Sequence, residues 1–261
     1  MGLPYLREGR GRSSLIMARF YVQQPQIVNG ILKVEGEEVR HIRKVLRLRV
    51  GDDLSIFDGS GKEYEGTLVE EESSSVSVKV RNIFLSMKES GLEIVLAQSL
   101  LKGEKMDYLI QKATELGVKR IVPFISSRSI PLLEKEKRLE RHRRWEKIAI
   151  GASKQCGRGI VPEIGPLQDF PQILESVPKD LLRLILWEKE GERLKGALKR
   201  MERGKGVFFL VGPEGGLSAE EVEGAKKAGF FPITLGERIL RSETASLCLL
   251  SVLQYEWGDM G

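Results

Sequence analysis

The sequence predicts an α/β protein in which a small N-terminal β-barrel precedes a larger domain with a mainly parallel sheet covered by helices. The first observation is a change of period, because strand-like runs up to about residue 86 give way, after residues 88–91, to strands that alternate with helices. The second is the apolar run 207–211, which has the composition of a buried parallel strand and stops at a glycine-rich turn. The third is a similar turn after the apolar run 230–235, so that the pair predicts a ligand site at the carboxyl edge of the sheet.

The first 16 residues are rich in glycine and arginine and show no periodicity. We expect them to be a basic extension without regular structure. They are either an RNA-binding arm or a product of start-codon assignment, with Met17 as the alternative start, and the sequence leaves both possibilities open.

Residues 17–88 are predicted to form the barrel domain, because short β-branched and aromatic runs are separated by Gly, Asp and Ser turns. Between the second and third runs, Val39, Ile42, Val45 and Leu46 are predicted to share the apolar face of a helix. The opposite, basic face is either a solvated helix side or a surface that contacts phosphates. The predicted strands are 20–22, 31–34, 54–57, 64–69 and 76–84.

Residues 89–261 are predicted to form the α/β domain. A capping box of Ser218 and Glu221 opens one helix, and Ser242 or Thr244 can cap the last. The predicted strands are 92–97, 121–124, 181–187, 207–211 and 230–235, and the other helices are 106–116, 138–153, 170–177, 193–202 and 243–257.

Composition limits the possible functions. Lys and Arg number 42 against 37 for Asp and Glu, a net charge of +5 that suits a polyanionic partner but is also common in ordinary basic enzymes. Cys156 and Cys248 lie far apart without metal-type spacing, which favours a reducing cytoplasm over a disulfide framework or a zinc site. No apolar run approaches the roughly 18 residues that a membrane span needs. We therefore expect a cytoplasmic protein with no metal and no membrane partner.

The chemistry-bearing motifs are the two turns. A single glycine-rich turn is most often only a turn, and the sequence has no P-loop, no Gly-x-Gly-x-x-Gly after a strand and no His-Glu-x-x-His. With two histidines, a Ser-His-Asp triad is also disfavoured. Pro213 fixes one dihedral of the first turn, whereas Gly215 and Gly216 free the next ones.

Gly-Pro-Glu-Gly-Gly at 212–216 with Leu-Gly-x-Arg-Ile-Leu-Arg-x-Glu-Thr-Ala at 235–245 resembles the signature of the RsmE family, and the resemblance extends through the chain from about Met17. RsmE proteins are SPOUT-class methyltransferases. The resemblance implies a PUA-like N-terminal barrel, a C-terminal α/β sheet tied in a deep trefoil knot, S-adenosylmethionine as the cofactor and a homodimer. It also implies methylation of uridine N3 in 16S ribosomal RNA of the small subunit.

Two alternatives remain. One is a SPOUT methyltransferase that acts on another RNA site or another atom. The other is a non-catalytic, ribosome-associated RNA-binding protein whose glycine turns are only turns.

The resemblance assigns the cofactor to the two turns, where glycines let the backbone approach a ligand and Ile239 and Leu240 offer apolar contact. The residues so assigned are Leu210, Gly212, Glu214, Gly215, Gly216, Leu235, Gly236, Ile239, Leu240 and Arg241. RNA contacts are expected from Arg19, Arg40, His41, Arg43, Lys44, Arg47 and Lys102.

For catalysis we expect arginines to stabilise the negative charge that develops on the carbonyls beside N3, with Arg128, Arg158 and Arg241 as the candidates. Glu243 is the candidate proton acceptor, although an acid at a helix start is also favoured by the helix dipole alone. On the last helix, a stripe of Ala245, Cys248, Leu249, Val252 and Tyr255 is either core or part of a twofold interface.

Overall fold

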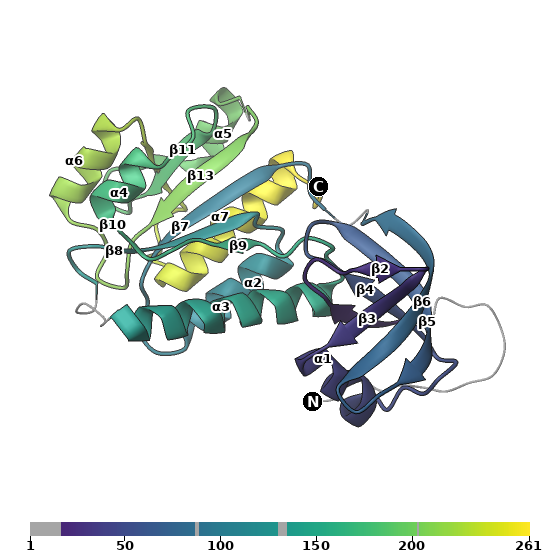
Figure 1. The fold of residues 1–261 in the computed structure, drawn as a ribbon. Coiled ribbons are helices and arrows are strands. Elements are labelled where there is room, and N and C mark those ends of the chain that lie inside the picture. The colour runs from purple at the N-terminus through teal and green to yellow at the C-terminus, as the bar shows by residue number, and fades with distance from the viewer. Residues whose placement is uncertain (1–16, 87–88, 130–134, 203) are drawn as a thin grey trace. The chain divides into compact units, whose positions relative to one another are not determined.

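The computed structural model describes residues 17–86, 89–129, 135–202 and 204–261 (Figure 1). The extension expected at 1–16 lies outside the described residues. The described chain divides into two compact units. The first comprises the described residues up to Ile56 together with Tyr64–Ile83, and the second comprises Phe57–Glu63 and the described residues of Phe84–Gly261. The expected boundary near residue 88 lies close to this division. The segment Phe57–Glu63 goes with the second unit because Gly59 and Ser60 form bridges with Ile160.

The first unit is built on a six-stranded sheet in the order β1-β4-β5-β6-β3-β2. All five predicted strands are present, and the additional strand β2 carried no signal because both of its residues are exposed. The sheet surrounds a core that includes Phe20, Leu32, Ile56 and Leu68. The bounds are β1 Ala18–Tyr21, β2 Ile27–Val28, β3 Ile31–Glu35, β4 Asp53–Phe57, β5 Lys62–Glu71 and β6 Ser75–Leu85.

The predicted helix of this unit is a short α-helix, α1 (Glu37–Arg40), that continues as a π-helical segment, η1 (His41–Val45). Val39 and Ile42 are buried as predicted, but Val45 is 63% exposed. The prediction that Val45 faces the core was therefore wrong. The wider π turn rotates the helix surface away from the 3.6-residue period on which the prediction was based.

The second unit contains a parallel sheet in the order β10-β8-β7-β13-β11-β14-β12, with β9 paired to β8. The predicted strands and helices are confirmed, whereas β9, β10 and β12 have two residues each and were too short to predict. The strands are β7 Glu93–Ser99, β8 Arg120–Ile125, β9 Glu163–Ile164, β10 Gln168–Asp169, β11 Leu182–Leu186, β12 Glu192–Arg193, β13 Gly206–Val211 and β14 Phe231–Thr234. The helices are α2 Lys105–Glu115, α3 Lys135–Cys156, α4 Phe170–Glu175, α5 Leu194–Arg200, α6 Ala219–Lys227 and α7 Ser242–Trp257.

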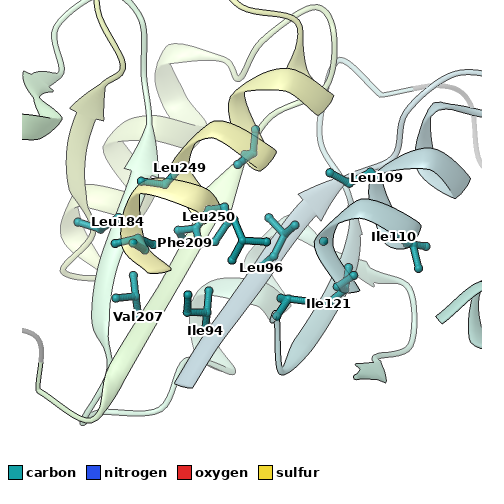
Figure 2. Close-up of a cluster of buried hydrophobic side chains, with 14 of the residues drawn as sticks. Ile94, Leu96, Leu109, Ile110, Ile121, Leu184, Val207, Phe209, Leu249 and Leu250 are labelled. Atoms are coloured by element: carbon teal, nitrogen blue, oxygen red, sulfur yellow. The ribbon is translucent and has the colours of Figure 1, made fainter. Parts of the chain in front are cut away.

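Helices cover both faces of this sheet (Figure 1). Alternate residues of each strand point to opposite faces, so Leu96 and Phe209 pack under α2, α3, α5 and α7, whereas Ala97 and Phe208 pack under α4 and α6. Figure 2 shows Leu249 of α7 lying over the side chains of the first face. Burial on both faces explains why the strands read as continuous apolar runs.

Strand β13 is buried along its whole length and lies between β7 and β11. Its last residue, Val211, pairs with Gln98 of β7, so the turn after β13 and the loop after β7 begin side by side. The trefoil knot stays a prediction from the family resemblance. In the described part of the chain, no helix is long and apolar enough to cross a membrane and no group of His, Cys, Asp and Glu could hold a metal ion.

Candidate active site

A cavity of about 530 Å³ opens at the carboxyl ends of β11, β13 and β14, in the second unit. Both glycine-marked turns and the start of α7 form its walls, as expected for the ligand edge of a parallel sheet. Seven of the ten residues predicted to bind the cofactor line it, namely Gly212, Glu214, Gly216, Leu235, Ile239, Leu240 and Arg241.

The other three predicted residues do not line this cavity. Leu210 is completely buried in the core beneath it. Gly215 lies on the outside of its turn, where the nearest atoms to an added Cβ would be those of Arg128 at 3.6 Å. Gly236 lines a neighbouring hollow of about 650 Å³ that α5 and α7 border.

The first turn is closed by a hydrogen bond from the Gly216 amide to the carbonyl of Pro213, at 2.9 Å. Gly216 has a φ of 67°, a left-handed conformation that side chains rarely adopt. A Cβ on Gly212 would lie only 2.9 Å from the side chain of Leu217. Of the two adjacent glycines, Gly216 and not Gly215 adopts a positive φ.

A buried polar network holds the turn to its neighbours. The amide nitrogen of Gln98, a fully buried side chain, donates to the Gly212 carbonyl at 3.4 Å and to the Ser242 hydroxyl at 3.0 Å. The Ser242 hydroxyl donates to the same Gly212 carbonyl at 2.6 Å, and the Ser246 hydroxyl donates to Gln98 Oε1 at 2.6 Å. The network joins β7, the turn after β13 and α7. The only feature of the sequence that indicates this network is a glutamine at the end of a buried strand.

The loop after β8 is fixed to the same turn. The capping box is confirmed: Ser218 accepts from the Glu221 amide, and Glu221 accepts from the Ser218 amide at 2.8 Å. Glu221 also accepts from the Ser127 amide at 2.7 Å. Arg128, which is exposed, donates from Nη1 to the Gly215 carbonyl at 3.0 Å. The candidate Arg128 therefore lies beside the first turn, at its outer side.

Lys105, which the sequence did not single out as a site residue, also lines the cavity. Its Nζ lies 3.0 Å from Glu214 Oε1 and 3.9 Å from Glu243 Oε1. Although burial raises the pKa of Glu214, hydrogen bonds from backbone amides, including that of Lys102, and from Lys105 hold the pKa below its ordinary value. Glu243 is 9% exposed, and its Oε2 has no hydrogen-bond partner among the described residues. A general base needs an accessible oxygen, so the structure does not favour Glu243 as the proton acceptor.

Arg158 was expected to reach the substrate from a loop, and the structure contradicts this. Its side chain is 5% exposed and forms an ion pair with Glu89, with Nη2 at 2.9 Å from Oε2. Its Nη1 donates to the carbonyls of Thr114 and Val118 at 2.8 and 3.0 Å. A guanidinium fully engaged inside the protein cannot also hold a nucleobase, so Arg158 fixes the end of α2 instead.

The residues predicted to bind RNA fall into two groups. In the first unit, Arg40, Lys44 and Arg47 are exposed around α1 and η1, but Arg43 is held to the β5–β6 turn through the carbonyls of Glu72 and Ser73. His41 packs edge-on against Phe20, and Arg19 is half-buried on β1. The remaining residue, Lys102, is exposed in the second unit.

Family models match most of the chain. Residues 88–254 match an RNA methyltransferase domain, and residues 34–81 match an RNA methyltransferase PUA domain. The ribosomal RNA small subunit methyltransferase E of Bacillus subtilis is 32% identical over 248 residues, which cover 92% of this chain and 97% of that protein.

Solved structures agree with this match. The crystal structure of a ribosomal RNA small subunit methyltransferase E from Neisseria gonorrhoeae, bound to S-adenosyl methionine, has a TM-score of 0.85 and 35% identity, and covers 94% of this chain and 100% of that chain. A protein of Legionella pneumophila in complex with the same cofactor has a TM-score of 0.84 and 34% identity, with the same coverage.

Replacing Arg158 by alanine should destabilise the second unit by about 2–3 kcal/mol, because the carbonyls of Thr114 and Val118 lose a buried donor and Glu89 loses one of its two cationic partners. The other cation, Lys119, stays with Nζ at 3.2 Å from Glu89 Oε2 and limits the loss. Urea denaturation measures this loss. Burial raises the pKa of Glu89, but Arg158 and its other hydrogen-bond donors hold the pKa below its ordinary value. The stabilisation is therefore present at neutral pH and shrinks as the pH falls through the folded pKa.

The matched control is Arg193→Ala, which removes an ion pair to Glu237 between side chains that are 73% and 87% exposed. It should change stability by less than about 1 kcal/mol. Equal losses for the two variants would contradict the structural role of Arg158.

Proposed function

Because the chain belongs to the ribosomal RNA small subunit methyltransferase E family, we infer that it transfers a methyl group from S-adenosylmethionine to N3 of a uridine in 16S ribosomal RNA. The observation that carries this proposal is the cavity in which both glycine turns meet at the carboxyl edge of the sheet. The relatives crystallised with S-adenosylmethionine share a third of their sequence with almost the whole chain.

The residues present fit this cofactor. The cavity volume lies in the usual range for small-molecule sites. Gly212 and Gly216 line the cavity with backbone alone, since a Cβ on Gly212 would clash with Leu217 and Gly216 has a φ of 67°. Leu235 and Leu240 offer apolar surface to an adenine ring. Ile239 lines the cavity although it is 87% exposed. Such an exposed apolar side chain gains burial when a ligand covers it.

The chemistry requires alignment and the handling of one proton. The bound cofactor supplies a methyl group activated on a sulfonium, so the protein must place uridine N3 in line with it. N3 becomes a good nucleophile only as its proton leaves and negative charge spreads to the carbonyls on either side. Arg128 beside the first turn and Arg241 on the cavity wall are the donors that we assign to this charge. Glu243, whose Oε2 is shielded from solvent, is assigned a structural role and not that of the proton acceptor.

The RNA contacts of the first unit are assigned to the exposed basic residues Arg40, Lys44 and Arg47. Cationic side chains on a PUA-like domain suit the phosphate backbone, which positions the RNA without reading its sequence. A purely RNA-binding function would leave the shaped cavity of the second unit without a role. Methylation of another RNA position is separated from our proposal by the first experiment below.

The purified protein should add one methyl group to 16S ribosomal RNA taken from cells that lack this activity, and nuclease digestion with mass spectrometry should identify N3-methyluridine. A methyl group at another atom would contradict the assignment of N3.

The Arg128→Ala variant should lower the single-turnover rate about 10²- to 10³-fold at saturating RNA and cofactor, as expected when one charge-stabilising donor is lost. A change confined to RNA affinity would contradict the role of Arg128.

Gly216→Val should abolish binding of S-adenosylmethionine in isothermal titration calorimetry, because the position requires φ near 67° and lines the cavity. The neighbouring Gly215→Val is the matched control, since its Cβ would meet only ordinary contacts at 3.6 Å or more. It should leave the affinity almost unchanged. Circular dichroism of both variants shows whether they remain folded.

We also infer a homodimer. Of the stripe on α7, Leu249 is fully buried in the core and Ala245 lines the cavity, whereas Cys248 and Val252 are half-buried and Tyr255 is 63% exposed. An aromatic side chain that continues an apolar stripe into solvent suits an interface between copies. Light scattering at micromolar concentration should give about twice the chain mass of 29.4 kDa. Tyr255→Glu should reduce this value, and a monomeric wild-type protein would exclude the dimer.

A further inference from the structure

A groove of about 500 Å³ lies between α2 and α3, two helices that pack side by side in the second unit (Figure 1). It is separate from the cavity at the carboxyl edge of the sheet, because the two share no lining residue. Glu104 lines the groove, and the next residue, Lys105, lines the cavity. The groove therefore begins at the end of α2 that borders the site of methyl transfer, and the proposed function does not use it.

The α3 side of the groove contains a glycine that packing does not require. Gly151 lies within α3, where glycine is less favourable than any residue except proline. A Cβ placed on Gly151 would meet no atom of the described residues within 4 Å. Ile148 and Ala152 line the groove beside it. This side of the groove is therefore apolar and has a position where a ligand can approach the helix backbone closely.

The α2 side of the groove presents an exposed aromatic ring. Tyr108 lines the groove and is 51% exposed. Arg144 of α3 also lines the groove, and Asp107 of α2 fixes its guanidinium, with Nε at 2.8 Å and Nη2 at 2.6 Å from Oδ2. Aromatic rings and guanidinium planes are the surfaces on which proteins stack unpaired nucleobases.

Two further side chains give the groove polar groups of both kinds. Glu104 and Gln111 are exposed and line it. A carboxylate accepts hydrogen bonds and an amide both donates and accepts them, which matches the mixed edge of a nucleobase. The lining has the carboxylates of Glu104 and Asp107 against the one guanidinium of Arg144, so it disfavours a phosphate. An uncharged, planar base fits it better.

The surface of α3 outside the groove carries the charge that attracts phosphates. The helix has eight Lys and Arg side chains against three Glu, an excess as large as the net charge of +5 of the whole chain. Arg143 and Lys147 are exposed, do not line the groove and share one helix face at a spacing of four residues. Like charges at this spacing destabilise a helix slightly, and a bound polyanion removes their repulsion.

Single-stranded RNA has both complementary features, because its unstacked bases are planar and uncharged while its backbone is a row of phosphates. We propose that the groove between α2 and α3 binds an unstacked nucleobase of the RNA substrate, stacked on Tyr108, and that Arg143 and Lys147 contact phosphates of the same strand. This proposal rests on the proposed function and adds a site for RNA in the second unit, apart from the cofactor cavity.

Two alternatives give different results. If α3 is only a solvated basic helix beside an ordinary crevice, neither the ring of Tyr108 nor the open position at Gly151 matters for RNA. If a second copy of the chain covers the groove, changes at these residues alter the mass of the protein in solution.

The first test fills the groove without removing a contact. Gly151→Leu should weaken binding of the 16S RNA segment that carries the methylation site about 5- to 100-fold in fluorescence anisotropy, the usual effect of losing one stacked base. Its melting temperature should not fall, because the change removes a glycine from a helix and meets open space. Gly224→Ala in α6 is the matched control, since its Cβ meets only an ordinary contact at 3.7 Å, and it should leave RNA affinity unchanged.

The second test removes the ring and the charge in turn. Tyr108→Ala should weaken RNA binding by a similar factor, and Tyr108→Phe, which keeps the ring, should recover most of the affinity. Arg143→Gln should reduce the slope of log affinity against log salt by about one. Lys205→Gln, at a lysine that is 74% exposed and pairs with Asp180, should not change this slope.

Calorimetry with S-adenosylmethionine and light scattering complete the comparison. The variants at Tyr108 and Gly151 should bind the cofactor as wild type does and keep the wild-type mass. A lower mass for Tyr108→Ala would assign the groove to a second copy of the chain and overturn the proposal. If wild type transfers no methyl group to the RNA, the proposed function itself fails. If it does and both groove variants bind RNA as wild type does, only the role of the groove fails.

Discussion

The hydrogen bonds of one buried glutamine hold the functional edge of the second unit together. Gln98 meets the carbonyl of Gly212 and the hydroxyls of Ser242 and Ser246, so a single side chain connects β7 with the cavity turn and α7. A buried amide that lost these partners would pay its full desolvation cost. The cavity therefore keeps its shape only while three segments far apart in the sequence stay in register.

The charged side chains around the cavity are likewise paired with groups from other segments of the chain. Glu221 bonds backbone amides of both the turn and the loop after β8, and Lys105 balances two carboxylates from two further elements. Burying any of these charged side chains without a partner would cost free energy. Since the partners come from separate loops, the charge pairs position those loops as well as neutralising one another.

Burial separates the arginines that hold the protein together from those that can meet RNA. Arg158 was predicted to contact the substrate because it follows a helix in a glycine-containing loop. Its guanidinium is instead buried and bound by Glu89 and two backbone carbonyls. Arg128 follows a strand in a similar polar loop and stays exposed beside the turn. Both are arginines in loops of the same unit, and only the packing around them distinguishes their roles.

The sequence by itself determined the α/β class, the helices, every described strand longer than two residues, and the two turns that form the cavity. These features are local, since they depend on the period of apolar residues and on the conformations that glycine and proline permit. Tertiary structure decided what depends on distant partners. It placed Leu210 in the core and Gly215 outside the cavity, enclosed Arg158, brought Lys105 to Glu214 and Glu243, and turned Val45 outward through a π-helical segment. Periodicity carries no information about such contacts, because they join residues that only the packed sheet and its helices bring together.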